Sequence, residues 1–455
     1  MKIYIATWGN PFAWKETQYR YGNEILKSCS TLEIIDKIEN PDKIIIISLD
    51  SIADQDPNCI NCKEYNEIVE IAKNKIQEYI VNNLKLEYLL NKTEVITSLS
   101  VGEFQRLSMV GQSTDFYFHT FHNLSKFFIE YFLMNKNKIK ISDNIEIIID
   151  ISHGINFMPV ICYSVTRMIL NIWGFLFNNL RIRVLNSDPF IGQANPQYLN
   201  INVIEETRIV PRIYISSDDL FLSRSLLVSP FVEDNLKKEI VKRKNEFTLE
   251  ENNTYREALI FLSAFYNKLP LYSVVYLPNK QKITELINKI INEHLNYITV
   301  EIRSEKKLKV QRNLFINHHF ENLLKVLSLI SIFEYLGVKA SDEVEINELK
   351  NLNQKLFENF SVEKNRVEVE IEEIKQKEKY IIGNFREYIN IENEFRKQLR
   401  INTLQFSNTI NRRNFFAHAG LEYNSIKIKK VGEKIFLKVN EIFKKEIENI
   451  LLSSL

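Results

Sequence analysis

Short runs of isoleucine, valine and leucine alternate with helix-like stretches in the N-terminal part of this chain. Each run is apolar at nearly every position, which is typical of strands that are covered on both faces of a sheet. Helical patterns at about 60–90, 115–137 and 155–180 separate the runs. Strand, helix and strand repeated in this order predict a doubly wound parallel sheet. The expected strands are KIYIATWG, KIIIISLD, EVITSLSVG, NIEIIIDIS and RIRVLNSD.

One more segment of this part alternates with period two. It is NPQYLNINVIEET, which opens with Asn195 and Pro196. We expect it to form a hairpin or an edge strand that closes the sheet.

The apolar spacing changes to three and four from about residue 206 onward, which predicts helices. The alternating stretch YITVEIRSEKKLKV interrupts these helices and is compatible with a β-wing. No proline follows Pro278, which favours long helices up to the C-terminal end. The predicted fold class is therefore α/β plus all-α. We expect a Rossmann-like domain with a parallel sheet over 1–205, a helical linker domain over 206–340, and an all-helical domain over 341–455.

The composition bounds the class of protein. A chain of 455 residues is too long for one ordinary core, so several domains are expected. The formal charge of +1 means that any nucleic-acid binding relies on local basic patches. Four cysteines make no disulfide framework, and we interpret the Cys59 and Cys62 pair as an ordinary loop. The N-terminus has no signal-peptide pattern, and Arg167 interrupts the longest apolar stretch, so a cytoplasmic protein is expected.

Two segments with an unusual composition follow predicted strands. They are ATWGNPFAWKETQY after the first strand and DISHGINFMP after the strand that ends at Asp150. The carboxyl ends of parallel strands are where ligands bind in such a sheet. The glycine spacing fits neither the dinucleotide fingerprint nor the P-loop. The expected contributions are a close backbone approach at Gly9 and Gly154, hydrogen bonds from Asn10, Ser152 and Asn156, and stacking faces on Trp8 and Trp14.

The sequence RNFFAH at 413–418 is the second candidate site. Positions four apart nearly align on a helix, so Asn414 and His418 share a face and the long side chain of Arg413 reaches round to it. The two phenylalanines between them can anchor the helix. Arginine binds phosphate and histidine transfers protons near neutral pH, which is sufficient for RNA cleavage without a metal. One such helix supplies only half of a site, so we expect a second copy opposite it. The structural alternative is an ordinary helix end before Gly420.

Taken together, ATWGNPFAW, DISHGINFMP and RRNFFAHAG resemble segments of CRISPR-associated ancillary ribonucleases, which join a CARF sensor domain to a HEPN ribonuclease domain. The resemblance implies a CARF domain over 1–205 and a HEPN domain over 341–455. It implies a homodimer or higher homo-oligomer that binds a cyclic oligoadenylate, with cyclic tetra-adenylate expected, and no metal cofactor. It also implies an endoribonuclease that cleaves single-stranded RNA in type III CRISPR antiviral defence. The residues expected at the messenger are Gly9, Asn10, Trp14, Ser30, Thr31, Ser152, His153, Gly154 and Asn156, and those expected to be catalytic are Arg413, Asn414 and His418.

Two other functions stay open on the sequence alone. One is a ligand-responsive transcription regulator in which residues 206–310 form a winged helix-turn-helix that binds DNA. The other is a HEPN toxin that senses a different nucleotide. His119 and His122 have a spacing compatible with metal binding, but the sequence fixes no acidic or cysteine ligand nearby, so we interpret them as polar positions on a half-buried helix.

Overall fold

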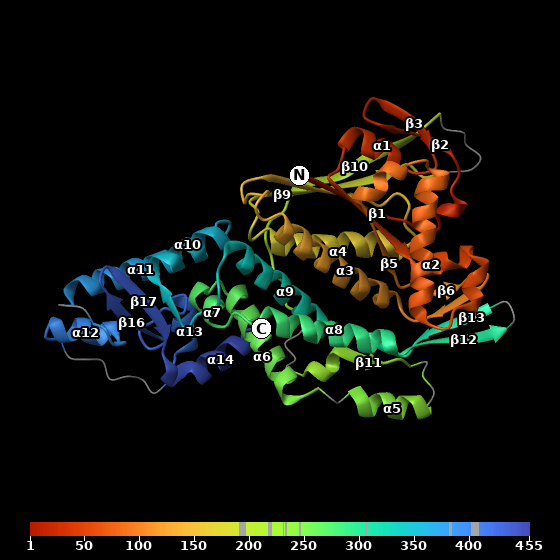
Figure 1. Ribbon diagram of the computed structural model, residues 1–455. Coiled ribbons are helices and arrows are strands. Elements are labelled where there is room, and N and C mark those ends of the chain that lie inside the picture. The colour runs from red at the N-terminus through yellow and green to blue at the C-terminus, as the bar shows by residue number, and fades with distance from the viewer. Residues whose placement is uncertain are drawn as a thin grey trace. The chain divides into compact units, whose positions relative to one another are not determined.

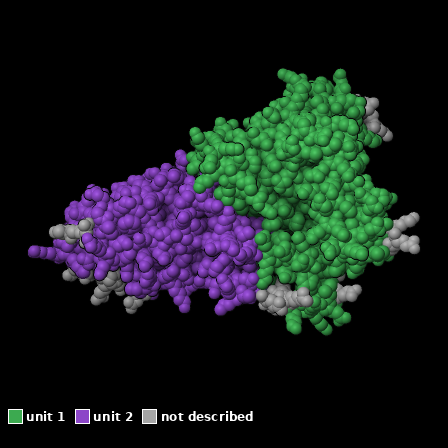
Figure 2. Space-filling model, in the orientation of Figure 1, with its two compact units in different colours: residues 1–210, 223–246, 288–317 green, residues 211–222, 247–287, 318–455 purple. Residues whose placement is uncertain are grey.

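The computed structural model describes residues 1–190, 197–216, 221–230, 232, 234–244, 247–304, 307–381, 385–401 and 409–455. Asn195 and Pro196, which open one of the expected strands, lie outside the described residues. The chain divides into two compact units, which Figure 2 distinguishes by colour. Unit 1 comprises residues 1–210, 223–246 and 288–317, and unit 2 comprises residues 211–222, 247–287 and 318–455.

An eight-stranded sheet forms the centre of unit 1. Five of its strands run parallel to one another, and each overlaps one of the five predicted strand sequences, so that prediction is confirmed. In spatial order the strands are β3 (Glu24–Ser28), β2 (Thr17–Tyr21), β10 (Leu199–Arg208), β9 (Asn179–Ser187), β8 (Asn144–Asp150), β1 (Lys2–Thr7), β4 (Lys43–Leu49) and β5 (Thr93–Ser98).

The connections of this sheet reverse direction at β1. Among the five parallel strands, the order along the chain runs from β1 through β4 to β5 on one side, and then continues with β8 and β9 on the other side of β1. This order creates a topological switch point between β1 and β8. The crossover helices α3 and α4 lie side by side (Figure 1). The helices of the sheet are α1 (Leu32–Glu39), α2 (Tyr65–Glu78), α3 (Ser113–Met134) and α4 (Phe157–Trp173).

The strand β10 pairs antiparallel with the preceding strand β9, as the hairpin alternative predicted. It is not the closing edge of the sheet, because it also pairs parallel with β2 on its other side. The hairpin of β2 and β3 extends the sheet beyond it. The sequence of this hairpin, TQYRY and EILKS, is short and polar, so its strand pattern was weak.

A second sheet of unit 1 contains the alternating stretch that was compatible with a β-wing. Its strands are β12 (Ile298–Ser304), β13 (Lys307–Arg312), β7 (Leu107–Val110) and β6 (Gly102–Glu103) in spatial order. β12 and β13 form the hairpin, and β13 pairs in parallel with β7, so one edge of the hairpin is already occupied. The same unit contains β11 (Leu226–Val228), which pairs with β14 (Leu314–Ile316), and α5 (Asp234–Lys244).

A buried ion cluster lies between β13 and the main sheet. Arg312 has no exposed surface, and its Nη2 lies 3.3 Å from Asp50 Oδ2. Its Nη1 lies 3.8 Å from Asp115 Oδ2, which is also buried. Asp50 accepts further hydrogen bonds from Ser100 and Tyr65. A cation between two buried carboxylates offsets the cost of burying them.

Unit 2 is mainly helical, as the change of periodicity predicted. Its helices are α6 (Leu249–Tyr266), α7 (Pro270–Val275), α9 (His319–Leu336), α10 (Ile346–Leu356), α11 (Ser361–Tyr380), α12 (Ile391–Gln398), α13 (Arg412–Ala417) and α14 (Lys444–Leu452). The helix α8 (Lys280–Asn296) contains residues of both units. Among the described residues, no helix is both long and apolar enough to span a membrane.

The expectation of an all-helical segment over 341–455 was wrong in one respect. Three antiparallel strands lie within it, in the spatial order β15 (Glu343–Glu345), β17 (Lys434–Val439) and β16 (Ile426–Val431). In IKIKKV, Ile426 and Ile428 are buried while Lys427 and Lys429 are more exposed, which is the period of a strand. Gly432 has a left-handed φ of 61° in the turn that follows. The lysines made this stretch resemble a solvated basic run.

Candidate functional site

The two loops predicted to bind a ligand meet at the switch point of the main sheet. β1 and β8 are neighbours, and Gly9 at the end of one donates its N–H to the His153 carbonyl after the other, at 2.9 Å. A Cβ at Gly9 would lie 2.5 Å from Ile155 Cγ1, and a Cβ at Gly154 would lie 2.5 Å from Pro159 Cγ. These glycines therefore let the two loops pack closely.

Asp150, the last residue of β8, organises these loops. Its Oδ2 accepts hydrogen bonds from Tyr4 at 2.8 Å and from the Thr31 hydroxyl at 2.5 Å. Its Oδ1 accepts the Ser152 N–H at 2.9 Å. The Asp150 side chain was not among the predicted site residues, although a carboxylate directly at the end of a buried parallel strand was a usable signal.

The His153 ring is fixed on two sides. Its Nε2 accepts the Thr31 N–H at 3.3 Å, so the proton of the neutral ring is on Nδ1. Burial lowers the pKa of His153, with Asp150 opposing the shift, which favours the neutral ring at pH 7. Trp14 stacks on this ring with centroids 4.2 Å apart. Trp14 is only partly exposed, and Trp8 is fully buried behind it, so the expected stacking face on Trp8 is not available.

The remaining predicted residues of this site differ in exposure. Ser30 and Thr31 have no exposed surface, and the Ser30 hydroxyl accepts the Leu32 N–H at 3.2 Å, so both support the start of α1 from beneath. Asn10 caps the short 3-10 helix η1 (Pro11–Ala13). The Ser152 hydroxyl accepts the Ser187 N–H at 2.8 Å. Asn156 is exposed at the start of α4 and has a left-handed φ of 33°.

The second site lies on α13, a helix of 6 residues that the Asn411 side chain caps. Arg413, Asn414 and His418 are all exposed. Phe415 is fully buried and packs edge-on against Tyr272, so the anchoring role predicted for it is confirmed. Asn414 and His418 line one cavity, as their spacing predicted. His418 is the last residue of the turn, which makes this helix shorter than the sequence indicated.

A tight turn after His418 fixes the end of α13. Ala419 and Gly420 both have left-handed φ values, of 50° and 73°. The Gly420 N–H donates to the Phe415 carbonyl at 2.7 Å and the Ala419 N–H to the Phe416 carbonyl at 3.2 Å, which is the Schellman arrangement. The Tyr272 hydroxyl donates to the Gly420 carbonyl at 2.9 Å.

We expect Gly420→Ala to destabilise unit 2 by about 2–4 kcal/mol, since it combines left-handed strain with overpacking. The new Cβ would lie 2.3 Å from Cε2 of the buried Tyr272 ring. Gly432→Ala is the control, because Gly432 also has a left-handed φ but no atom within 4 Å of the added Cβ. Urea unfolding followed by circular dichroism measures both variants. Equal losses in the two variants would contradict the role given to the Tyr272 contact.

A carboxylate that was not among the predicted site residues orients His418. Glu370 on α11 lies with its Oε1 2.8 Å from His418 Nδ1. The Glu370 side chain is 13% exposed and the His418 side chain 47%. Burial raises the pKa of Glu370, and the bond to His418 opposes this rise. With Glu370 ionised, Nδ1 donates to it and Nε2 is left for proton transfer.

We expect Glu370→Gln to lower the rate of RNA cleavage roughly tenfold to a hundredfold at neutral pH, which is a part of what general acid–base catalysis contributes. The amide oxygen accepts the same hydrogen bond but carries no charge. Wild-type activity should fall as Glu370 takes up a proton, at a higher pH than for an exposed glutamate, and the variant should lack this fall. Rate measurements across the acid range test this, with the exposed Glu372→Gln as the control. An unchanged profile in Glu370→Gln would refute the role.

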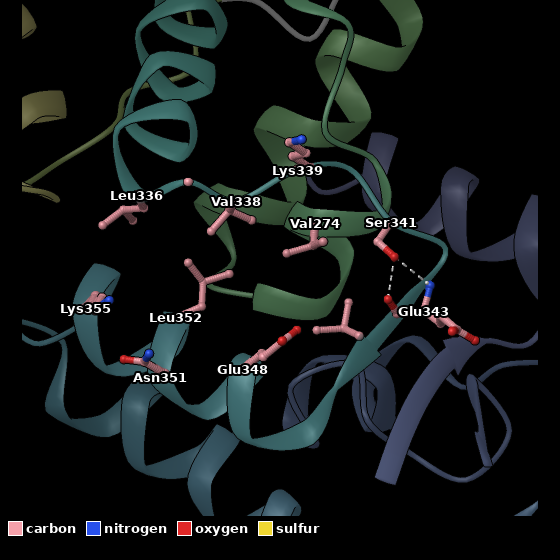
Figure 3. A pocket seen from close by; sticks show the side chains of 12 residues that line it. Val274, Leu336, Val338, Lys339, Ser341, Glu343, Glu348, Asn351, Leu352 and Lys355 are labelled. Carbon is pink, nitrogen blue, oxygen red and sulfur yellow. Dashed lines mark hydrogen bonds between the residues drawn. The ribbon is translucent and has the colours of Figure 1, made fainter. Parts of the chain in front are cut away.

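Unit 2 has another cavity, of about 400 Å³, which is larger than the one lined by Asn414 and His418 (Figure 3). Val274, Leu336, Val338, Val344 and Leu352 line it with apolar surface, and Lys339, Glu343, Glu348 and Lys355 add charges around them. It contains none of the predicted site residues.

In the described part of the chain, no three His, Cys, Asp or Glu side chains are grouped so that they could hold a metal ion. Cys59 lies in the 3-10 helix η3 (Pro57–Asn61), and Cys62 directly follows it.

The chain thus combines a Rossmann-like domain, with two close loops at its switch point, and a mainly helical region that carries an Arg/His motif on α13. Two family models match it. The one described as CRISPR system endoribonuclease Csx1, CARF domain, matches residues 3–189, and the one described as its HEPN domain matches residues 360–441. The CRISPR system endoribonuclease Csx1 of Methanocaldococcus jannaschii is 29% identical over 482 residues, covering 99% of this chain and 93% of that protein.

The chain belongs to the CRISPR-associated ribonucleases that combine a CARF domain with a HEPN domain. It is therefore an endoribonuclease. The resemblance found in three short segments is confirmed, and so is the fold class of a parallel sheet followed by helical regions.

Proposed function

We propose that this endoribonuclease cuts single-stranded RNA without a metal ion and is switched on by a cyclic oligoadenylate, in type III CRISPR antiviral defence. The observation that carries the cleavage part is the exposed His418, held through Nδ1 by the half-buried Glu370, five residues after the exposed Arg413. The four free cysteine thiols fit a reducing compartment, and we propose the cytoplasm.

The side chains of α13 have distinct roles in this proposal. His418 takes the proton from a ribose 2′-OH or gives one to the leaving 5′-oxygen, through the Nε2 that Glu370 leaves free. The 2′-oxygen forms a bond to phosphorus and the bond from phosphorus to the 5′-oxygen breaks, so the products are a 2′,3′-cyclic phosphate and a 5′-OH. Arg413 holds the phosphate and stabilises its developing charge, and Asn414 orients the pair.

The site is proposed to be complete only with a second copy of the chain. One α13 presents a single Arg413 and a single His418, both exposed on a short helix. Two helices across a two-fold axis would surround one phosphate with two of each. We accordingly propose a homodimer or higher homo-oligomer, with a CARF domain over 1–205, a linker over 206–340 and a HEPN domain over 341–455.

The activator is proposed to bind at the switch point of the main sheet. Trp14 and His153 offer ring edges there, and Asn10, Ser152 and Asn156 offer polar groups. The N-terminus of α4 adds backbone N–H groups that favour a phosphate. Gly9 and Gly154 keep the loops close, while Ser30 and Thr31 act from beneath by fixing Asp150 and α1. Cyclic tetra-adenylate is the expected messenger.

The experiment is cleavage of end-labelled single-stranded RNA in the presence and absence of EDTA, each with and without cyclic tetra-adenylate or cyclic hexa-adenylate. We expect cleavage that the messenger accelerates, with 2′,3′-cyclic phosphate ends and none on the matching DNA. RNA left intact under every condition would refute the proposed cleavage activity. Loss of cleavage in EDTA alone would refute metal independence.

A further inference from the structure

The cavity that Asn414 and His418 line contains groups that the cleavage step does not use. Its volume is about 240 Å³. Its apolar and aromatic walls come from Ile374, Ile391, Leu421 and Tyr423, and its charged groups are Glu370, Glu373, Lys377, Glu392, Arg396 and Glu422. A cavity with apolar walls and a few polar groups is typical of a binding site for a flat, partly polar ligand.

Both cations of this cavity are already neutralised. Lys377 Nζ lies 2.6 Å from Glu373 Oε1 and 2.7 Å from Glu392 Oε2. Arg396 Nε lies 2.6 Å from Glu392 Oε1. Because these cations have carboxylate partners, the cavity offers little to a phosphate, and hydrogen-bond acceptors outnumber donors in it.

Glu422 differs from the other carboxylates that line the cavity. Glu422 as a whole residue is only 7% exposed. Its Oε2 accepts the Asn424 N–H at 3.3 Å, whereas its Oε1 is buried and has no hydrogen-bond partner among the described residues. A buried acceptor without a donor is costly, so a ligand that brings an N–H to it gains more than a typical hydrogen bond. Burial also raises the pKa of Glu422, as expected for a carboxylate that lacks partners.

We propose that this cavity holds the base of a nucleotide next to the scissile phosphate, and that Glu422 selects a base with an exocyclic amino group over uracil. The inference rests on the proposed function, because only RNA bound at His418 and Arg413 places a base here. Single-stranded RNA offers unstacked bases whose edges a protein can read in this way.

The base chemistry explains the direction of the preference. Guanine presents adjacent N–H donors on N1 and N2, and adenine and cytosine present an amino group on N6 and N4. Uracil has a single N–H, on N3, between two carbonyl oxygens that would be repelled by a carboxylate. A base edge and one buried carboxylate oxygen form the kind of contact that discriminates by about 1–3 kcal/mol, or roughly 5- to 150-fold.

The test sequences the cut ends that the full-length protein makes from a pool of single-stranded RNA with random sequence. For the wild type we expect uracil to be depleted roughly tenfold at one of the two positions that flank the cut. Glu422→Gln should lose most of that depletion, since an amide offers both a donor and an acceptor. Glu378→Gln is the control, because Glu378 is 9% exposed, carries a bond to Lys430 and does not line the cavity. An identical base profile in wild type and Glu422→Gln would overturn the proposal.

A second measurement separates this inference from the cleavage mechanism. Short 2′-O-methyl RNAs cannot be cut by their 2′-oxygens, and their affinity can be compared when one central uridine is replaced by guanosine or adenosine. We expect the wild type to bind the purine-containing oligomers about fivefold to tenfold more tightly, and Glu422→Gln to bind all of them similarly. Selective binding without cleavage would refute the proposed function alone, whereas cleavage without base preference would refute the role of Glu422 alone.

Discussion

His418→Ala should reduce the rate of RNA cleavage by a factor of about 10²–10⁴, the range that general acid–base catalysis contributes. The fold should be retained, because the His418 side chain is 47% exposed and its replacement leaves no cavity in the core. Initial rates on a labelled single-stranded RNA at saturating cyclic tetra-adenylate measure the loss. Thermal unfolding of the same sample checks that the stability changes by less than about 0.5 kcal/mol.

The chain offers a matched control for this variant. His318 is also exposed, also lies in unit 2, and also contacts a glutamate through Nδ1, at 2.5 Å from Glu321 Oε1. It is not near the Arg413 motif in the sequence and is assigned no role in cleavage. His318→Ala should therefore keep nearly full activity. Equal rates for wild type and His418→Ala would remove the catalytic assignment from α13.

Arg312→Met should destabilise unit 1 by about 3–5 kcal/mol at pH 8, the usual cost of removing one partner from a buried ion pair. The side chain of Met is similar in length, so the loss is mainly electrostatic. Asp50 and Asp115 would then be buried without their cation. All three tryptophans lie in unit 1, so urea unfolding followed by tryptophan fluorescence reports on this unit.

The loss of stability in Arg312→Met should depend on pH. Burial already raises the pKa of Asp115 to about 6, against the opposing charge of Arg312, and it also raises the pKa of Asp50. Without Arg312 both pKa values rise further, so the folded variant binds protons that the unfolded chain releases at the same pH. Its stability must then increase as the pH falls from 8 toward 5. A deficit that is the same at both pH values, or larger at pH 5, would contradict the buried-charge explanation.

The parallel sheet was predictable because its signal is local. Strands such as KIIIISLD are apolar on both faces, and the order of strands and helices sets the topology with few alternatives. The strands β16 and β17 were missed because their outward residues are lysines, which are typical of a solvated face. Their alternation around Ile426 and Ile428, with Gly432 at the turn, was the signal that predicts a hairpin.

The candidate sites were predictable only in part. The residues of RNFFAH and of the two loops were found because these polar and aromatic side chains lie beside a predicted turn or strand end in the sequence. Two carboxylates were missed: Glu370, which orients His418, and Asp150, which orients the loops after β1 and β8. Glu370 lies 48 positions before its partner and Asp150 lies 119 positions after Thr31, and a single sequence does not show which distant side chains meet. Glu422 lies shortly after the motif in the sequence. Only the fold shows that its Oε1 lacks a hydrogen-bond partner among the described residues.

We propose that a messenger bound at the loops after β1 and β8 controls RNA cleavage at α13. The most direct test is the rate of RNA cleavage against the concentration of cyclic tetra-adenylate, for the wild type, Trp14→Phe and Trp14→Ala. We predict a wild-type rate that rises with messenger and saturates. Trp14→Phe should respond similarly, and Trp14→Ala should need about tenfold more messenger to reach the same maximum, because a lost aromatic contact costs about 0.5–1.5 kcal/mol. A wild-type rate that does not depend on the messenger, or an unchanged response in Trp14→Ala, would contradict this account.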